Sequence, residues 1–317
     1  MAVHTHLSEI EILDIVKMYD IGDLKKYRGI KDGIENTNYY LRTTQSSFIL
    51  TIFENRIKKT KIPKILNLLE YTVKKGISCP LPVSDKQNRI INNYKKKKFS
   101  LFNFLTGSAK QEWSEKECYQ VGKTLGHLHL RNINYQPKLK NDFGYLSWKG
   151  LCGASFSKYK GLSAQKKQAI LKEIDFIISN WPGNLPKGTI HADFFPDNVF
   201  FNKNKISGII DFYFSCYDLL SYDLAITINA WCFENRSFNK LKFKKLISGY
   251  EKKRKLKIEE KDKINILLRG ASLRFLLTRI YDSIFSYKNK FLSPKDPLEY
   301  LNILEFHINK KNESYFK

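Results

Sequence analysis

The sequence contains few cysteines, and their positions argue against a fold stabilised by disulfides or by a zinc ion. The chain has five cysteines in 317 residues. They are widely spaced, no two form a C-x-x-C pair, and no histidine lies beside them at metal-ligand spacing. A disulfide framework and a zinc site are therefore not expected. The cysteines are Cys79, Cys118, Cys152, Cys216 and Cys232.

Long apolar runs are also absent. No run approaches the roughly 18 apolar residues that a membrane-spanning helix needs. The first residues, MAVHTHLSEIEILDIV, lack the apolar core of a secretory signal. We therefore expect a cytoplasmic protein without a membrane span. The hydrophobic content of 42% is ample for a core, and the length suits one large or two medium domains.

Acidic residues are scarce relative to basic ones. The chain has 31 Asp and Glu against 55 Lys and Arg, which gives a formal net charge of +24. Such an excess favours contact with nucleic acids or membrane surfaces. However, the lysines are scattered, and the chain is also rich in Ile, Asn, Phe and Tyr, so an AT-rich genome explains the composition more simply. The run YKKKKF (94–99) is typical of an exposed hairpin loop, and no specific nucleic-acid partner is expected.

The N-terminal third predicts a small antiparallel sheet with two helices. Ser8 and Glu11 have the spacing of a capping box that opens an amphipathic helix. Residues 27–54 then contain β-branched and aromatic runs broken by polar turns, which is typical of paired strands. The segment 61–76 has apolar residues at helical spacing and ends in a glycine, and 89–105 predicts another hairpin.

The remainder of the chain predicts mostly helices. Ser114 and Glu117 form a second capping-box pattern, and strand signals are limited to GTIHADF, NVFF and ISGIIDFYF. Further helices are expected near 165–180, 221–233, 238–252, 258–284 and 296–309. The predicted fold is α+β and bilobal, with a sheet lobe (1–101), a hinge (102–106) and a larger helical lobe (107–317). Ligand sites favour such junctions between lobes.

Four polar residues interrupt the apolar strands around residue 200. They are His191, Asp193 and Asn198 in IHADFFPDNVFF, and Asp211 at the end of a predicted hairpin that returns it beside Asn198. Phosphoryl transfer from a magnesium nucleotide needs a carboxylate to orient and deprotonate an alcohol, and oxygen ligands for the metal. Asp193 fits the first task, and Asn198 and Asp211 fit the second. Any one of them alone is equally typical of an ordinary turn.

The segment HADFFPDN followed by GIIDF resembles the H-x-D-x-x-x-x-N motif and following Asp of the aminoglycoside phosphotransferase and choline kinase superfamily, which has a protein-kinase-like fold. Further segments are similar to the homoserine kinases of this fold, which make O-phosphohomoserine for threonine biosynthesis. These segments are GIENTNYYL (33–41), FILTIFE (48–54), VGKTLGHLHL (121–130), LPKGTIHADFFPDNVFF (185–201), GIIDFYFSCYDLLSYDLAITINAWCFE (208–234) and LLRGASLRFLLTRIYD (267–282).

The resemblance implies roles for individual residues. Asp193 would be the catalytic base, and Asn198 and Asp211 would hold Mg²⁺ on ATP. His191 would hold the catalytic loop by hydrogen bonding, and Asp223 would tie the start of a helix to that loop. The residues of the loop over the nucleotide phosphates would be Gly33, Asn36, Thr37 and Asn38. Gly33 would let the backbone turn tightly there, although a plain hairpin glycine fits as well.

The adenine site departs from the protein-kinase pattern. Strand alternation places Ile49 and Thr51 on one face, so Ile49 would cover adenine and Thr51 would stand where protein kinases have a lysine. Arg42 on the neighbouring strand can substitute for that cation. The connector LFNFL (101–105) would read the adenine edge through its backbone, and Phe102 and Phe104 either line this site or belong to the core.

The substrate is expected to be homoserine, whose carboxylate needs a cation. Arg274 and Arg279 can supply it, although helix arginines more commonly snorkel or cap carbonyls. The alternatives are a kinase of another small alcohol, such as choline, a methylthio-sugar or an aminoglycoside, and a catalytically silent nucleotide-binding module. The Thr51 substitution favours the silent module, whereas intact Asp193, Asn198 and Asp211 favour catalysis. A monomer is expected.

Overall fold

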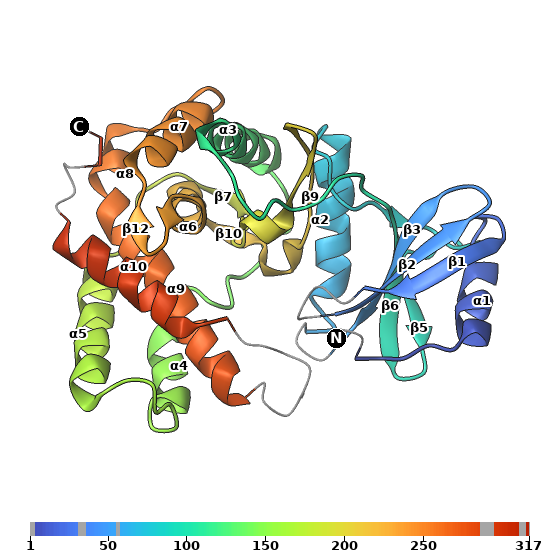
Figure 1. Cartoon of the computed structure of the whole chain (residues 1–317), viewed down its shortest axis with the longest axis horizontal. Helices are drawn as coiled ribbons and strands as arrows, with labels where there is room; N and C mark the ends of the chain where they lie inside the picture. The colour runs from blue at the N-terminus through green and yellow to red at the C-terminus, as the bar shows by residue number, and fades with distance from the viewer. Residues whose placement is uncertain (1–3, 31–35, 55–57, 286–294, 311–314, 317) are drawn as a thin grey trace. The chain divides into compact units, whose positions relative to one another are not determined.

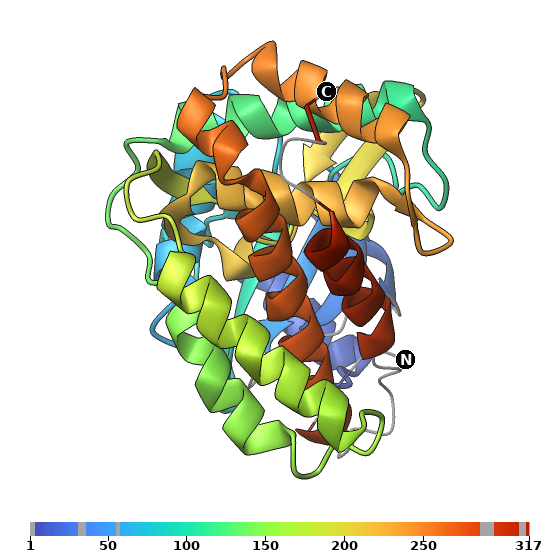
Figure 2. The ribbon, with the colours of Figure 1, turned by 90° about the vertical axis from the view of Figure 1, so that its left-hand side faces the viewer.

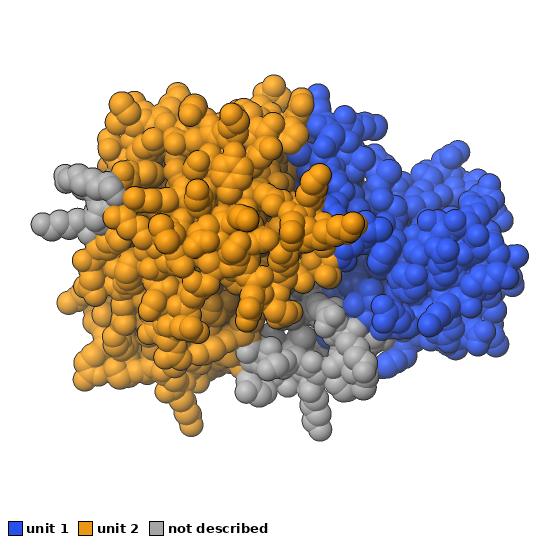
Figure 3. Space-filling view, turned by 45° about the horizontal axis from the view of Figure 1, so that its top comes forward, with its two compact units in different colours: residues 1–107, 207–213 blue, residues 108–206, 214–317 orange. Residues whose placement is uncertain are grey.

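The structure is a computed structural model that describes residues 4–30, 36–54, 58–285, 295–310 and 315–316. The chain divides into two compact units (Figure 3). The first comprises 1–107 with 207–213, and the second comprises 108–206 with 214–317. The boundaries expected from the sequence, 1–101, 102–106 and 107–317, remain a prediction. They did not set apart 207–213, which belongs to the first unit.

The first unit is built on a six-stranded antiparallel sheet with the order β1-β2-β3-β6-β4, in which β5 also pairs with β6 (Figure 1). Alternation of buried and exposed side chains along β2 is the pattern expected for a strand with one face on a core. The strands are β1 (Leu24–Gly29), β2 (Thr37–Thr43), β3 (Ser47–Phe53), β4 (Pro82–Val83), β5 (Asn92–Tyr94) and β6 (Lys97–Asn103).

Helix α1 (Glu9–Lys17) packs its apolar side chains into one core with those of this sheet. Its predicted capping box is confirmed, because the Ser8 hydroxyl accepts from the Glu11 backbone N–H and the Glu11 carboxylate accepts from the Ser8 N–H at 2.8 Å. The core cluster contains Ile12, Ile15 and Val16 of the helix and Tyr39, Leu41, Leu50, Ile52, Phe99 and Leu101 of the sheet.

Helix α2 (Ile62–Lys74) follows the predicted pattern in the first unit. Ile62, Ile65, Leu66 and Leu69 are buried, as their spacing indicated. Gly76 follows the helix with a φ of +83°, a backbone conformation that glycine adopts without steric cost. The predicted hairpin in the YKKKKF region is confirmed by the pairing of β5 with β6.

The second unit is mainly helical. Helices α3 and α7 lie side by side, as do α9 and α10 (Figure 2). Two short antiparallel pairs, β7 with β10 and β11 with β12, accompany the helices. The bounds are α3 (Glu115–Asn132), α4 (Trp148–Ser155), α5 (Ala164–Asn180), β7 (Lys187–Ile190), β8 (Val199–Asn202), β10 (Cys216–Leu219), α6 (Leu220–Trp231), β11 (Phe233–Glu234), β12 (Ser237–Phe238), α7 (Lys240–Glu251), α8 (Ile258–Asp262), α9 (Ile264–Phe285) and α10 (Pro297–Asn309).

Two predicted strands end earlier than expected, and each ends before a residue with positive φ. GTIHADF forms a strand only to Ile190, and Ala192 has a φ of +64°. ISGIIDFYF contributes β9 (Lys205–Ile209), and Asp211 also has a φ of +64°. A left-handed residue breaks the extended backbone, so the polar residues leave the strands there. Helix α4 and strand β10 had no clear signal in the sequence.

No helix among the residues that the structure describes is long and apolar enough to cross a membrane.

Glycines bring α3 and α7 unusually close together. A Cβ atom added at Gly122 of α3 would lie 1.9 Å from the Leu246 carbonyl oxygen, and one at Gly249 of α7 would lie 2.0 Å from the Tyr119 carbonyl oxygen. Both obstacles are backbone atoms, which cannot rotate away. The contact between the two helices therefore depends on the absence of side chains at these positions.

We expect Gly122→Ala to lower the free energy of unfolding by about 1–3 kcal/mol or more, because the added methyl group forces the helices apart. Gly150→Ala is the matched control, since Gly150 is an exposed glycine of α4 with open space around its Cβ position. That change should be neutral or stabilise by up to about 1 kcal/mol through helix propensity. Urea unfolding of both variants measures the difference, and equal effects would contradict the packing argument.

Candidate active site

A short irregular loop carries Asp193 between β7 and the 3₁₀ turn η2 (Pro196–Asn198). The carboxylate of Asp223, at the start of α6, accepts hydrogen bonds from the backbone N–H groups of His191 and Ala192, both at 2.8 Å. Asp223 is fully buried. The strained left-handed backbone of Ala192 is thus held by two hydrogen bonds to one charged group, which is how such strain persists.

A second contact secures this carboxylate from α3. The Nε2 atom of His129 lies 3.0 Å from Asp223, and its Nδ1 atom lies 2.8 Å from the Tyr250 hydroxyl of α7. Burial opposes ionisation of Asp223, yet the hydrogen bonds from His129 and from the His191 backbone hold its pKa below the usual value. Burial also lowers the pKa of His129 against the pull of Asp223. The side chain of His191 accepts from the Asp193 N–H at 3.2 Å.

The structure brings Asp193 and Asn198 into direct contact. The Asn198 side-chain Nδ2 donates to the Asp193 carbonyl oxygen and to its Oδ2 atom, each at 2.9 Å. This fixes the rotamer of the carboxylate and leaves Oδ1 of Asn198 as an acceptor on the other side of the amide. The five-residue spacing thus orients the Asp193 carboxylate beside the amide group of Asn198.

Burial raises the pKa of Asp193 to about 6, and the charge of Asp197 acts in the same direction. The charges of Arg274 and Lys295 and the hydrogen bond from Asn198 oppose this rise. A carboxylate with such a pKa is ionised at neutral pH and is a better proton acceptor than an ordinary aspartate.

Two basic residues that lie near this loop come from distant parts of the sequence. Arg274 of α9 is buried and donates through Nη1 to the Ala192 carbonyl oxygen. Lys295 pairs with Asp197 at 2.7 Å, and both are about half exposed. Sequence reasoning missed Lys295, for which no motif gives a signal.

The other predicted substrate arginine, Arg279, is bound elsewhere in the second unit. Its Nη1 atom donates to the Asp296 carbonyl oxygen at 2.9 Å and to the Glu299 carboxylate at 2.7 Å. These contacts join α9 to the start of α10. A substrate role for either arginine remains a prediction.

Asp211 belongs to the first unit, directly after β9. Its φ of +64° turns the chain out of the strand, so that the short 3₁₀ turn η3 (Phe212–Phe214) follows. Its metal-ligand role remains a prediction.

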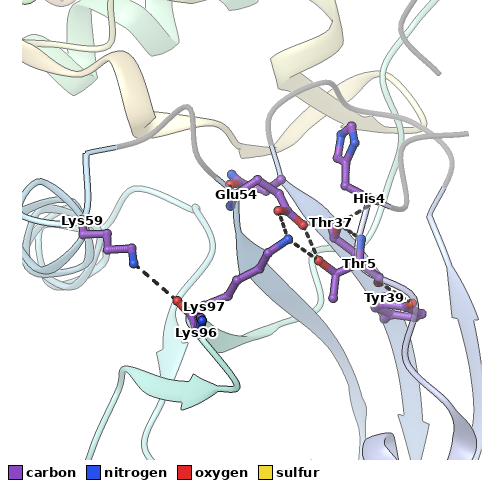
Figure 4. Close-up of polar contacts among 9 residues, drawn as sticks. His4, Thr5, Thr37, Tyr39, Glu54, Lys59, Lys96 and Lys97 are labelled. Atoms are coloured by element: carbon purple, nitrogen blue, oxygen red, sulfur yellow. Dashed lines mark hydrogen bonds and ion pairs between the residues drawn. The ribbon is translucent and has the colours of Figure 1, made fainter. Parts of the chain in front are cut away.

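The predicted phosphate-loop residues lie in and just before β2, except Gly33, which is outside the described residues. Thr37 is fully buried, and its hydroxyl accepts from the backbone N–H groups of His4 and Thr5 and donates to Glu54 (Figure 4). Asn36 is also buried and accepts from the Glu54 N–H at 3.3 Å. The side chains of Asn36 and Thr37 therefore bind the start of β2 to other residues of the first unit.

The same network includes a lysine. Lys97 at the start of β6 binds the carboxylate of Glu54 and donates to the Thr5 hydroxyl at 2.6 Å (Figure 4). The N-terminal segment is thus tied to the ends of β2, β3 and β6.

The opposite face of the sheet carries the residues predicted to surround adenine. Asn38 is opposite Thr51, and Ile49 is opposite both Tyr40 and Phe102. The Thr51 hydroxyl donates to the Asn38 side chain at 2.7 Å, so a neutral pair lies where a counterpart of the protein-kinase lysine was predicted.

Phe102 and Phe104 lie at the end of β6, and Arg42 lies near the end of β2. Phe102 is buried, whereas Phe104 is 40% exposed and packs edge-on against Tyr40 with ring centroids 5.4 Å apart. The guanidinium of Arg42 donates to Ser47 at 3.1 Å, near the turn that joins β2 to β3.

Comparisons with known proteins identify the family. A model of the phosphotransferase enzyme family matches residues 26–253. The chain is 40% identical over 308 residues to a homoserine kinase of Agrobacterium fabrum, covering 97% of this chain and 96% of that protein. It is 39% identical over 310 residues to a homoserine kinase of Rhodopseudomonas palustris, covering 98% and 95%.

Solved structures of low sequence identity share the fold. An aminopropanol kinase associated with a microcompartment superposes with a TM-score of 0.74 at 14% identity, covering 98% of this chain and 99% of that one. An amicoumacin kinase, solved with AMP-PNP, Ca²⁺ and its ligand, has a TM-score of 0.72 at 16% identity, covering 97% and 94%. The α+β fold class with an N-terminal antiparallel sheet and a helical C-terminal region is thereby confirmed. The chain belongs to the phosphotransferase enzyme family and, within it, to the homoserine kinases.

Proposed function

We propose that the chain is an ATP-dependent kinase that phosphorylates the side-chain hydroxyl of L-homoserine to O-phospho-L-homoserine, a step of threonine biosynthesis. The contact of Asp193 with Asn198, on a loop anchored by a buried carboxylate, is the observation that carries the proposal. It supplies an oriented proton acceptor in a chain about 40% identical to homoserine kinases over nearly its full length.

Asp193 acts as the base in this proposal. Its carboxylate accepts the proton of the substrate hydroxyl, while Asn198 holds it in place through the bond to Oδ2. Because its pKa of about 6 lies below neutral pH, the group is ready to accept a proton without further change.

Mg²⁺ and ATP fit the donors that the chain supplies. An amide oxygen on Asn198 and a carboxylate on Asp211 are the hard oxygen ligands that Mg²⁺ prefers, usually with one or two carboxylates and phosphate oxygens completing the shell. Among the described residues no group of three or more His, Cys, Asp or Glu side chains is placed to hold a metal ion. The magnesium nucleotide would supply the phosphoryl group and neutralise its charge.

The nucleotide base would lie against the sheet face that carries Ile49, with Phe102 and Phe104 beside it at the end of β6. Asn38 on the same face, with Gly33, would approach the phosphates. Asn36 and Thr37 would shape that loop rather than touch the nucleotide, since both side chains are engaged with Glu54 or the N-terminal segment.

The remaining expectations are retained as parts of the proposal. We propose that the protein acts as a monomer in the cytoplasm, without a specific nucleic-acid partner, and that the basic excess reflects composition. Another small alcohol, such as choline, remains the alternative substrate.

We expect Asp193→Asn to retain the fold but to lose phosphoryl transfer by several orders of magnitude, because the alcohol loses its oriented proton acceptor. Asp175→Asn on α5 makes the same chemical change at a side chain that is 60% exposed and paired with Lys149, and should retain activity. ADP release coupled to homoserine measures both. Turnover of Asp193→Asn within tenfold of the parent would overturn the assignment.

The raised pKa of Asp193 predicts an acid limit to activity. Below about pH 6 the carboxyl group is protonated and no longer accepts a proton, so kcat/KM should fall about tenfold per pH unit. Above that value this group imposes no further change. Initial rates from pH 5 to 8, with a thermal melt at each pH as the folding control, test this limit. A constant kcat/KM down to pH 5 would argue against Asp193 as the base.

Substrate length provides the test of homoserine. Its hydroxyl lies two carbons beyond the α-carbon, whereas that of serine lies one carbon beyond, so serine cannot place both ends at once. We expect kcat/KM for L-serine to be at least about 100-fold lower, because misplacement by about one ångström costs that much. Matched initial rates with homoserine, serine and choline decide the matter. Turnover of choline without homoserine would leave a kinase of another alcohol.

A further inference from the structure

We propose that Arg274 binds the carboxylate of the substrate amino acid and that Asp218, positioned by Asn141, binds its ammonium group. This inference rests on the proposed function, since it concerns where the charged end of homoserine lies while its hydroxyl reaches Asp193. All of these residues belong to the second unit.

Arg274 is a buried cation without an ion-pair partner among the residues that the structure describes. Three arginine side chains are at most 9% exposed in the part of the chain that the structure describes. Arg254 binds Glu260 at 2.9 Å, and Arg279 binds Glu299 at 2.7 Å. Arg269, slightly more exposed, binds Glu173 through both Nε and Nη2. Arg274, only 2% exposed, donates a hydrogen bond to the Ala192 backbone carbonyl and binds no carboxylate among those residues.

The Nε atom of the Arg274 guanidinium is a buried donor that suits a carboxylate. Nη1 is occupied by the Ala192 carbonyl, and Nε is buried without a hydrogen-bond partner in the described part of the chain. Nε and Nη2 form the edge through which arginine binds a carboxylate with two parallel hydrogen bonds. An unsatisfied buried donor on a charged group is costly, so an anion bound there would supply both the missing bond and the missing charge.

Aromatic rings surround this guanidinium and compensate its charge only in part. Its Cζ atom lies 4.6 Å from the ring centroid of Phe275, 5.5 Å from that of Phe214 and 5.9 Å from that of Phe143. Cation–π contacts stabilise a buried cation less than an ionised partner does. The rings also exclude water, which strengthens any ion pair formed there.

Arg274 is placed to connect substrate binding with the base. The carbonyl that it binds belongs to Ala192, which directly precedes Asp193. A substrate carboxylate bound by this guanidinium would share Arg274 with the residue that precedes Asp193. This arrangement suits a short amino acid whose hydroxyl must reach Asp193.

Asp218 offers the opposite charge. Its Oδ2 atom accepts from Asn141 at 2.6 Å and its Oδ1 atom accepts from the Leu219 N–H at 2.7 Å, and no cation pairs with it among the described side chains. Burial raises the pKa of Asp218, against the hydrogen bonds and the charges of Lys187 and Arg274. An ammonium ion beside this carboxylate would lower its pKa again and favour the charged form.

Asn141 links the two ends of the site. Its Nδ2 atom binds Asp218, and its Oδ1 atom accepts from the Phe143 N–H at 2.9 Å. Phe143 in turn lies against Arg274 and packs edge-on against Phe214. Asn141 is therefore a positioning residue for both the carboxylate and the ring beside the guanidinium.

Two analogues of homoserine separate the roles. 3-Aminopropan-1-ol lacks the carboxylate, and 4-hydroxybutanoate lacks the ammonium group. Arg274→Met should reduce kcat/KM for homoserine and for 4-hydroxybutanoate by about 100-fold more than for 3-aminopropan-1-ol, whose smaller loss reports the contact of Arg274 with the Asp193 loop. Asp218→Asn should show the reverse selectivity, affecting homoserine and 3-aminopropan-1-ol and sparing 4-hydroxybutanoate.

Arg269→Met on the same helix is the matched control, because it removes another arginine that is largely buried but should leave the ratios between substrates unchanged. Calorimetric titration of homoserine in the presence of a non-hydrolysable ATP analogue provides a readout for variants with little turnover. We expect Arg274→Met to lose most of the homoserine affinity while its thermal melt remains cooperative.

The possible failures are distinguishable. If the parent protein does not phosphorylate homoserine, the proposed function fails and this inference fails with it. If homoserine is a substrate but Arg274→Met lowers kcat/KM equally for all three alcohols, Arg274 only supports the loop and this inference alone is overturned. Unchanged homoserine affinity in either Arg274→Met or Asp218→Asn would also overturn it.

Discussion

The buried carboxylate of Asp223 is the interaction on which the geometry of the site depends. An anion without solvent must collect hydrogen bonds or be neutralised, and Asp223 collects them from two consecutive backbone N–H groups and from His129. One charge thereby fixes the end of β7, the start of α6 and the last turn of α3 to one another. These hydrogen bonds stabilise the left-handed backbone at Ala192 and thereby fix the position of Asp193, the next residue.

Buried charges elsewhere in the second unit obey the same requirement. Arg254 pairs with Glu260, and Arg269 pairs with Glu173, each through two hydrogen bonds. Arg274 breaks the pattern beside the residue that would accept the substrate proton. The buried arginines of the scaffold and Arg274 thus have the same chemistry. They differ in whether a carboxylate of the described chain pairs with the guanidinium. An unpaired buried ion is costly for stability, which fits a site completed by a ligand.

Local features were predictable because their causes lie within a few residues. Both capping boxes form as expected, since Ser8 with Glu11 and Ser114 with Glu117 satisfy helix N–H groups three residues apart. The apolar face of α2 follows from the helical period. The predicted ends of the strands that became β7 and β9 lay several residues too late in the sequence. The alternation of apolar residues continues through Ala192 and Asp211, but the positive φ angles of these two residues prevent the strands from continuing.

The sequence by itself determined the capped starts of α1 and α3, the apolar face of α2 and the placement of Asp193 and Asn198 five residues apart in one loop. Only the tertiary structure decided which distant residues meet that loop. Arg274 reaches it from 82 positions away and Lys295 from 98, and Asn141 meets Asp218 across 77. The physical reason is that residue patterns report the exposure of each side chain along its own element. The partner across a packed interface is selected by the geometry of the whole unit.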